Sequence, residues 1–392
     1  MRIPSSYVPG YEKVRSSNPK LADRYMAHTM IGDPAADALI EELACLDPER
    51  VQRYIKACMN KDEEEARQAP EALRQLFQNI QALPEWYYSK DVLSGCRLFH
   101  KYSDLFLTAF VVSVLIRGFT TLISLSFFAT GRVMDYGVRR LRQNIAHLLE
   151  IMIPGGLDPH GDGWKLSVRI RLIHARLRKL FTESSEWNTD AHGIPLSAAH
   201  IGFAAASFSA MMLQDAKRLG VKASAEECAS FMHIWRCSAW LMGVPDEILF
   251  HDEEDALEIA RVILACEPPF AEEGIVMANA LINSAPIVAG IDDRNDRVKL
   301  VKRGYRLARA ILGNETADSL RFPRYHTFGV LPLLKMMHQL KELRQRLPLL
   351  RSEDLRVKKF STLLDITVLE DAHGGISYRL PDQHEANLVN KW

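Results

Sequence analysis

The sequence predicts an all-α protein: a single large helical domain with an N-terminal helical extension and an irregular C-terminal tail. Apolar residues recur with the 3.6-residue period of a helix along most of the 392 residues. Alternating strand patterns are scarce. No internal repeat, low-complexity tract or Gly/Ser linker divides the chain. We therefore expect residues 1–85 to form the extension, residues 86–347 the main domain and residues 348–392 the tail.

Helix-start signals place the elements in order. Proline follows a capping acid at Asp33-Pro34 and at Asp47-Pro48, and Pro70-Glu71 opens a third amphipathic run, so short helices are expected in the first part of the chain. A short hairpin is expected around Gly374-Gly375, within residues 364–380. The longer helices are predicted over residues 89–101, 103–129, 131–152, 164–183, 195–219, 224–242, 246–267, 271–289, 297–313 and 326–346.

Composition and charge exclude several classes of protein. The 49 basic and 49 acidic residues, with 47% hydrophobic residues, are typical of soluble globular proteins and not of collagen-like, disordered or polyelectrolyte chains. A net charge of +0 provides no overall attraction for nucleic acid, so we expect no nucleic-acid partner.

The cysteines favour a reducing compartment. No pair among the six has the C-x-x-C spacing of a zinc ribbon, an iron–sulfur cluster, a thioredoxin-type site or a covalent haem attachment. Nothing resembles a disulfide framework, and we therefore expect a cytoplasmic protein. The segment Met1–Arg15 lacks the apolar stretch of a signal peptide, so export would require a segment outside this sequence.

One apolar segment, Leu105–Phe128, has the length of a membrane span. Its single charge, Arg117, lies near the middle, where a charge is costly in lipid. A buried core helix is the favoured interpretation, and no stable membrane span is expected. A cofactor-free helical protein attached to membranes through this segment stays open as an alternative.

His174 is the strongest candidate for a cofactor ligand. On a helix it shares an apolar face with Ile170 and Leu177, while Arg171 and Arg178 lie one turn before and one turn after it. A neutral imidazole, apolar walls and flanking cations are what a b-type haem needs for its iron, its macrocycle and its propionates. Taken alone, a histidine on an apolar helix face is more often a hydrogen-bonded core residue, and the basic residues are then a solvated face or a patch for an anionic surface.

A polar row on the preceding helix is the second candidate. Arg140, Gln143, Asn144 and His147 share one helical face and could present polar groups to a bound oxygen species. The alternative is an exposed polar face. The common hydrolase, nucleotide-binding and zinc-protease motifs are absent from the sequence.

Several segments resemble the rubber oxygenase (latex-clearing protein) and MpaB-type oxygenase family. The most specific are the block from Gly163-Trp164 to Arg178, which contains His174, and the block from Trp235 to Gly243-Val244-Pro245. The resemblance extends over most of residues 20–325. Other matching segments are Gly32-Asp33-Pro34-Ala35-Ala36-Asp37-Ala38-Leu39, Leu83-Pro84-Glu85-Trp86, Thr130-Gly131-Arg132, and Gly193-Ile194-Pro195-Leu196 leading to Phe208-Ser209.

The resemblance implies an all-helical fold that encloses a non-covalent haem b, with His174 as the axial iron ligand. In that family the haem iron activates dioxygen to cleave a carbon–carbon double bond in polyisoprene or a terpenoid, and Arg140 matches an arginine near the distal pocket. We therefore predict a haem-dependent oxygenase with an apolar isoprenoid, terpenoid or lipid-like substrate. The predicted cofactor-binding residues are His174, Arg171 and Arg178, and the predicted catalytic residues are Arg140, Gln143 and Asn144.

Three departures separate this sequence from rubber oxygenases. Gln143-Asn144 stands where those enzymes carry Lys-Thr, so a lysine that could cap the iron is missing and His147 is the candidate sixth ligand. No acid stands near Ser124, where they carry a catalytic base, and Pro195-Leu196-Ser197-Ala198 replaces a Pro-x-Asn-Gln stretch. We expect a substrate other than rubber. A haem protein without oxygenase activity, a sensor or a peroxidase-like protein, is the alternative function.

Overall fold

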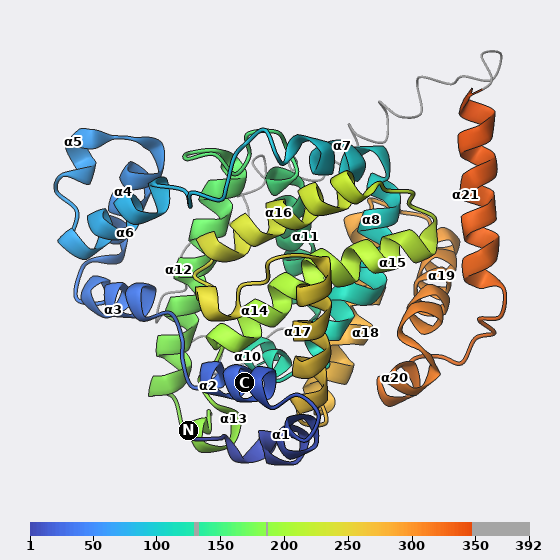
Figure 1. The fold of residues 1–392 in the computed structure, drawn as a ribbon, viewed down its shortest axis with the longest axis horizontal. Helices are drawn as coiled ribbons and strands as arrows, with labels where there is room; N and C mark the ends of the chain where they lie inside the picture. The colour runs from blue at the N-terminus through green and yellow to red at the C-terminus, as the bar shows by residue number, and fades with distance from the viewer. Residues whose placement is uncertain (129–132, 186, 347–392) are drawn as a thin grey trace.

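Every secondary-structure element of the described residues is a helix (Figure 1). The computed structural model describes residues 1–128, 133–185 and 187–346, apart from the side chains of residues 127–128, 133–137, 140 and 341–346. No strand occurs within these ranges, and the all-α prediction is confirmed. The hairpin predicted within residues 364–380 lies outside them.

The N-terminal helices begin where the sequence predicts. The side chain of Asp33 accepts a hydrogen bond from the backbone N–H of Ala36, and the side chain of Asp47 accepts from Arg50, so both acids cap a helix that opens with proline. The helices of this region are α1 (Val8–Arg15), α2 (Pro19–Thr29), α3 (Pro34–Leu43), α4 (Pro48–Asn60), α5 (Glu63–Ala66) and α6 (Glu71–Gln81).

The remaining helices follow the predicted order. Two short π-helical segments interrupt them, η2 (Phe110–Val114) and η3 (Ser207–Met211). The α-helices are α7 (Leu93–Lys101), α8 (Ser103–Ala109), α9 (Leu115–Phe119), α10 (Ile123–Phe128), α11 (Val133–Ile151), α12 (Asp162–Glu183), α13 (Thr189–His192), α14 (Ala198–Ala206), α15 (Met212–Leu219), α16 (Ala225–Leu241), α17 (Glu253–Cys266), α18 (Glu272–Val288), α19 (Arg294–Leu312), α20 (Asn314–Ser319) and α21 (Val330–Arg346).

Three predicted helices are shorter or more broken than expected. The helix expected over 103–129 divides into α8, η2, α9 and α10, because the hydroxyls of Thr120 and Thr121 donate to the last carbonyls of α9 and end it. The helix expected over 195–219 begins only at α14, capped by Ser197, and contains η3. The helix expected over 246–267 begins at α17, capped by Asp252.

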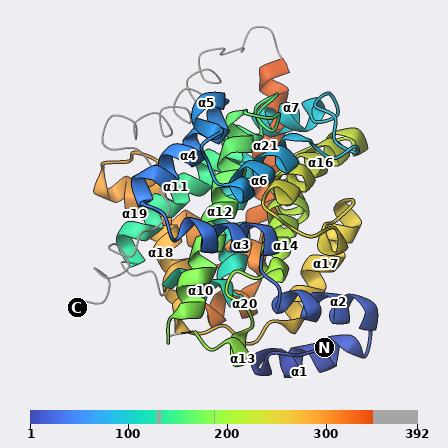
Figure 2. The same ribbon diagram turned by 90° about the vertical axis from the view of Figure 1, so that its left-hand side faces the viewer.

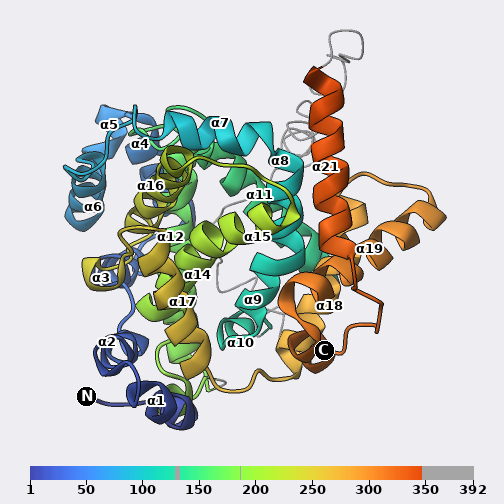
Figure 3. The same cartoon turned by 45° about the vertical axis from the view of Figure 1, so that its right-hand side comes forward.

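The helical core is organised around α11 and α12. Helix α11 packs against both α12 and α18, and α12 also contacts α3 of the N-terminal region and α16. Figure 2 shows α3 crossing in front of α12, and Figure 3 shows α21 at the periphery beside α15 and α19. Buried side chains form one continuous cluster from Tyr7 to Phe322, so the N-terminal helices contribute to the same core.

Arg117, the single charge of the predicted apolar segment, has a partner inside the protein. Its guanidinium lies 2.5 Å from Asp215 of α15, which also accepts a hydrogen bond from Ser113. The positive charge of Arg117 is therefore balanced by a carboxylate inside the helical core. Among the described residues no single helix is long and apolar enough to cross a membrane. Helix α7 and the stretch Ser103–Phe119 meet that criterion only together, and they are bent by 85°.

A buried carboxylate ties the N-terminal helices to the main domain. Glu267, at the end of α17, accepts hydrogen bonds from the hydroxyls of Tyr25 at 2.5 Å and Tyr7 at 3.2 Å. Its other oxygen accepts from the backbone N–H of Leu122 at 2.8 Å, and the ring of His200 lies 3.3 Å away. Burial raises the pKa of both tyrosines well above the ordinary value, so they stay protonated donors.

Replacing this carboxylate is expected to weaken the fold. In Glu267→Gln an amide NH₂ faces either a tyrosine hydroxyl or the backbone N–H of Leu122, and one buried donor loses its acceptor. We expect a loss of about 3 kcal/mol in the free energy of unfolding, measured by urea denaturation. Tyr25→Phe removes one donor and leaves the carboxylate in place, so its loss should be about 1 kcal/mol. An equal or larger loss in Tyr25→Phe would contradict the role of the carboxylate.

Alanine substitutions at two glycines, one at a close helix contact and one in open space, test the packing of α7 against α16. A Cβ atom added at Gly95 of α7 would lie 2.6 Å from the backbone nitrogen of Phe231 in α16, whereas one added at Gly118 of α9 would meet no atom within 4 Å. Gly95→Ala should lower stability by about 2 kcal/mol through overpacking. Gly118→Ala should raise it by about 0.5 kcal/mol through the helix preference of alanine. Thermal unfolding of the two variants measures both effects, and equal behaviour would refute the close contact of α7 and α16.

Candidate functional site

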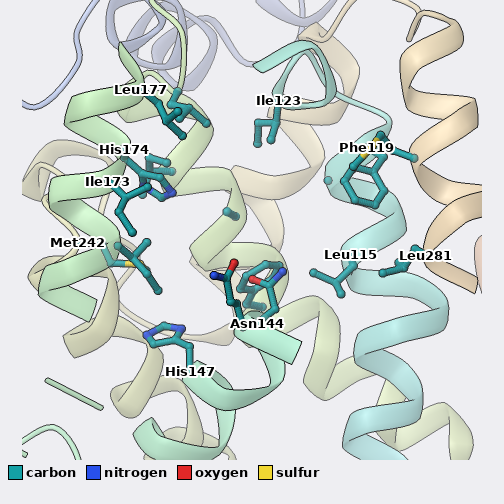
Figure 4. A pocket seen from close by; sticks show the side chains of 18 residues that line it. Leu115, Phe119, Ile123, Asn144, His147, Ile173, His174, Leu177, Met242 and Leu281 are labelled. Atoms are coloured by element: carbon teal, nitrogen blue, oxygen red, sulfur yellow. The ribbon is translucent and has the colours of Figure 1, made fainter. Parts of the chain in front are cut away.

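An apolar cavity lies between α9, α11, α12, α14 and α18, and its empty space is about 1380 Å³ with the open solvent at its mouth included. Figure 4 shows side chains from α9, α11 and α12 facing this space. Its polar lining residues are Gln143, Asn144, His147 and His174, and no described residue of the lining is an acid, a lysine or an arginine. The cavity is suited to an apolar molecule that has a small number of polar contacts.

His174 lies in the wall of this cavity on α12. Ile170, Ile173 and Leu177 of the same helix also line it, as the apolar stripe in the sequence predicts. His174 is half-buried, while the helix itself is anchored by buried residues such as Leu172 and Ala175. The imidazole is therefore presented to an apolar space from a fixed helix. Within the described ranges, no group of three or more His, Cys, Asp or Glu residues could hold a metal ion.

The two arginines beside His174 are paired with aspartates of the N-terminal region. Arg171 forms a two-point ion pair with Asp33, with N–O distances of 2.5 and 2.9 Å. Arg178 pairs with Asp37 at 2.7 Å and donates to the carbonyl oxygen of Leu196, a residue of the cavity wall, at 3.0 Å. Neither arginine lines the cavity. Their predicted role at haem propionates stays a prediction, and these ion pairs do not support it.

Two glycines of the matching sequence segments explain how these ion pairs fit. Gly243 has φ +83°, and a Cβ atom there would lie 2.8 Å from Nε of Arg171 and in contact with the Asp33 carboxylate. Gly32 lies against the second ion pair in the same way. The segments that resemble the oxygenase family therefore converge on two ion pairs that flank His174 on α12.

Helix α11 supplies the other polar residues of the cavity. Gln143, Asn144 and His147 line it together, so the structure brings three of the predicted site residues, Gln143, Asn144 and His174, to one space. Arg140 lies on α11, but its side chain is outside the described part of the chain. Ser124, near which no acid stands, is buried and donates its hydroxyl hydrogen to the carbonyl of Thr121.

His147 is held by two serines that the sequence analysis did not single out. Its Nε2 lies 2.9 Å from Oγ of Ser167 in α12 and 3.4 Å from Oγ of Ser238 in α16. The side chain is 4% exposed, and burial lowers its pKa to about 4, so it is neutral near pH 7. Both serines lie among buried apolar residues of their helices, and a small polar residue on such a face is the sequence signal that could have indicated these partners.

Comparison with known proteins places the chain in a family. The family described as "ER-bound oxygenase mpaB/B'/Rubber oxygenase, catalytic domain" matches residues 100–338. The chain belongs to this oxygenase family. The match includes the cavity-lining residues of α9, α11, α12, α14 and α18. Helices α1 to α6, with Asp33 and Asp37, precede it.

Two relatives show how far the similarity extends. A rubber oxygenase from Streptomyces sp. (strain K30) is 28% identical over 171 residues, which is 42% of this chain and 40% of that protein. The aligned part thus spans two fifths of the relative. The structure of a latex clearing protein in the closed state has a TM-score of 0.70 at 19% identity and covers 90% of this chain and 95% of its own. This second comparison shows a shared fold.

The neutral state of His147 should make folding stability depend on pH. In the unfolded chain the imidazole binds a proton below its ordinary pKa of 6.5, while the folded protein keeps it neutral down to about 4. The unfolded state therefore binds more protons, and stability falls as the pH drops through this window. The contribution of His147 is about 3 kcal/mol.

Urea denaturation at about pH 7.5 and about pH 4.5 measures this loss. In His147→Gln the side chain does not titrate, so the variant should lose about 3 kcal/mol less than the parent protein over the same interval. The difference between the losses of the two proteins gives the contribution of His147 alone, because the other histidines are present in both. A loss that is identical in parent and variant would show that His147 is not held neutral.

Proposed function

We propose that this protein is a haem b-dependent oxygenase that uses dioxygen to cleave or oxygenate a C=C bond in an isoprenoid, terpenoid or lipid-like apolar substrate. Membership of the oxygenase family supports the reaction class. The observation that carries the proposal is the position of His174 in the wall of a large apolar cavity. An imidazole on a rigid helix would hold the haem through its iron, and the haem would supply dioxygen binding and activation when bound.

The residues around the cavity fit a haem in two respects. His174 offers the ligand nitrogen, and apolar side chains such as Ile173, Leu177 and Met242 offer walls for the macrocycle and exclude water. The propionates would need positive or hydrogen-bonding partners at the mouth. Arg171 and Arg178 could bind the propionates only in addition to Asp33 and Asp37, because each guanidinium is already paired with one of these aspartates.

The other residues of the cavity then have separate tasks. The amides of Gln143 and Asn144 provide hydrogen-bonding groups on the α11 side of the cavity, as does His147. The apolar side chains of α9 and α18 accommodate the hydrocarbon part of the substrate, because they offer it no competing polar contact. The ion pairs of Arg171 and Arg178, one turn before and one turn after His174, keep its side chain directed toward the cavity.

The absorbance spectrum and a pyridine haemochrome assay test the cofactor. The parent protein should carry one haem b per chain, and His174→Ala should lose the bound haem because its iron ligand is removed. His233→Ala is the matched control. His233 is half-buried, stacks on Tyr87 at 5.6 Å and does not line the cavity, so this variant should retain haem. Stoichiometric haem in His174→Ala would overturn the assignment.

Oxygen uptake tests the reaction separately. The haem-loaded protein should consume dioxygen when an unsaturated isoprenoid is added, and a carbonyl or oxygenated product should form in proportion. A saturated analogue of equal length should give no uptake. A loaded protein that binds the isoprenoid and consumes no dioxygen would support the alternative function, a haem protein without oxygenase activity.

A further inference from the structure

The α11 side of the cavity contains a pair of polar groups whose hydrogen-bonding partner the proposed function does not name. Asn144 and His147 are three residues apart on α11, so they share a helical face, and both line the cavity (Figure 4). Within the described part of the chain, neither the amide of Asn144 nor Nδ1 of His147 has a hydrogen-bond partner. The remaining lining is mostly aliphatic or aromatic.

The hydrogen bonds behind His147 fix which of its nitrogens carries the proton. The hydroxyl of Ser167 lies 2.8 Å from the carbonyl oxygen of Gly163, which can only accept, so the serine hydrogen is used there. In its 2.9 Å contact with Nε2 of His147, Ser167 then accepts a hydrogen bond. The hydroxyl of Ser238 can donate to Ser167 Oγ at 3.3 Å, which is nearer to it than Nε2 at 3.4 Å, so Ser238 does not need the lone pair of Nε2. Nε2 carries the proton, and Nδ1 carries a lone pair.

A lone pair in an apolar cavity restricts the ligand that fits there. Dioxygen and a plain hydrocarbon have no hydrogen to donate to Nδ1, and a carboxylate would be repelled by it. A hydroxyl group can donate its hydrogen to Nδ1 of His147 and can accept one from the amide of Asn144 with its oxygen. The two groups together match a neutral alcohol.

We infer that the substrate is an unsaturated apolar alcohol, whose hydroxyl is bound between His147 and Asn144 while its chain lies along the aliphatic wall. This inference depends on the proposed function in one respect, which is that the cavity is the substrate-binding site. His147 is then a specificity-determining residue, and the enzyme should discriminate between an alcohol and the corresponding ether or hydrocarbon.

Binding measurements on the protein as isolated test this inference. The probes are geraniol, which donates and accepts, and geranyl methyl ether, which only accepts, and the dissociation constants are measured by isothermal titration calorimetry. The parent protein should bind geraniol about tenfold more tightly than the ether, since one buried hydrogen bond distinguishes them. Equal binding of the two probes would overturn the inference.

Two substitutions of His147 separate recognition from structure. In His147→Gln the amide nitrogen can replace Nε2 as the donor to Ser167 and nothing replaces Nδ1, so the preference for geraniol should disappear. In His147→Asn the amide oxygen can take the position of Nδ1 and the bond to Ser167 is lost, so the preference should persist. A purely structural role for His147 predicts the reverse, with the preference kept in His147→Gln and lost in His147→Asn.

Asn144→Leu provides an independent check. The amide should donate to the oxygen that both probes share, so this variant should weaken the binding of geraniol and of the ether by a similar factor and leave their ratio unchanged. A change confined to geraniol would contradict the assigned geometry.

A competing role for Nδ1 is coordination of iron. In the haem-loaded protein, an electron paramagnetic resonance spectrum of low-spin iron with two histidine ligands that disappears in His147→Gln would overturn the inference. The binding ratio requires neither haem nor turnover. A protein that binds haem and takes up oxygen could still lack the preference for geraniol, which would refute only this inference. A protein that does neither could still show the preference, which would refute only the proposed function.

Discussion

The candidate site depends on two ion pairs that lie outside the cavity. Arg171 and Arg178 lie one turn before and one turn after His174, and each is bound to an aspartate of the α3 segment. Because the pairs act on both sides of the histidine, they fix the rotation of α12 about its axis and hence the direction of the imidazole. Removing one partner would leave an uncompensated charge in a largely buried position.

The helical character and many helix starts could be predicted from the sequence, because capping acids and apolar periodicity act over a few residues. The stripe that directs His174 toward an apolar space could be predicted for the same reason. The aspartate partners of the arginines could not. Spacing along α12 shows which residues share its faces, but Asp33 and Asp37 are about 140 positions away in the sequence and reach α12 only through the tertiary fold.

The same limit explains the other differences. The threonines that end α9 and the serines that orient His147 have no distinguishing pattern in the sequence. Their roles depend on the carbonyl or the imidazole that their hydroxyls contact in the folded protein. Apolar periodicity also does not reveal η2 and η3. Both segments lie within apolar runs, and a π-helical turn within an apolar run has the same kinds of residue as an α-helical turn. The sequence is most informative where local chemistry decides the structure.

The two π-helical segments have a consequence for alignment. Each five-residue segment accommodates one residue more than an α-helical turn, and one residue rotates every later side chain by about 100° about the helix axis. Phe208 of η3 lines the cavity and packs edge-to-face against Phe110 of η2 at 5.3 Å. In a relative whose helix is regular here, the equivalent side chain can be matched only with a one-residue gap inside the helix. Gaps confined to loops would compare residues on different faces.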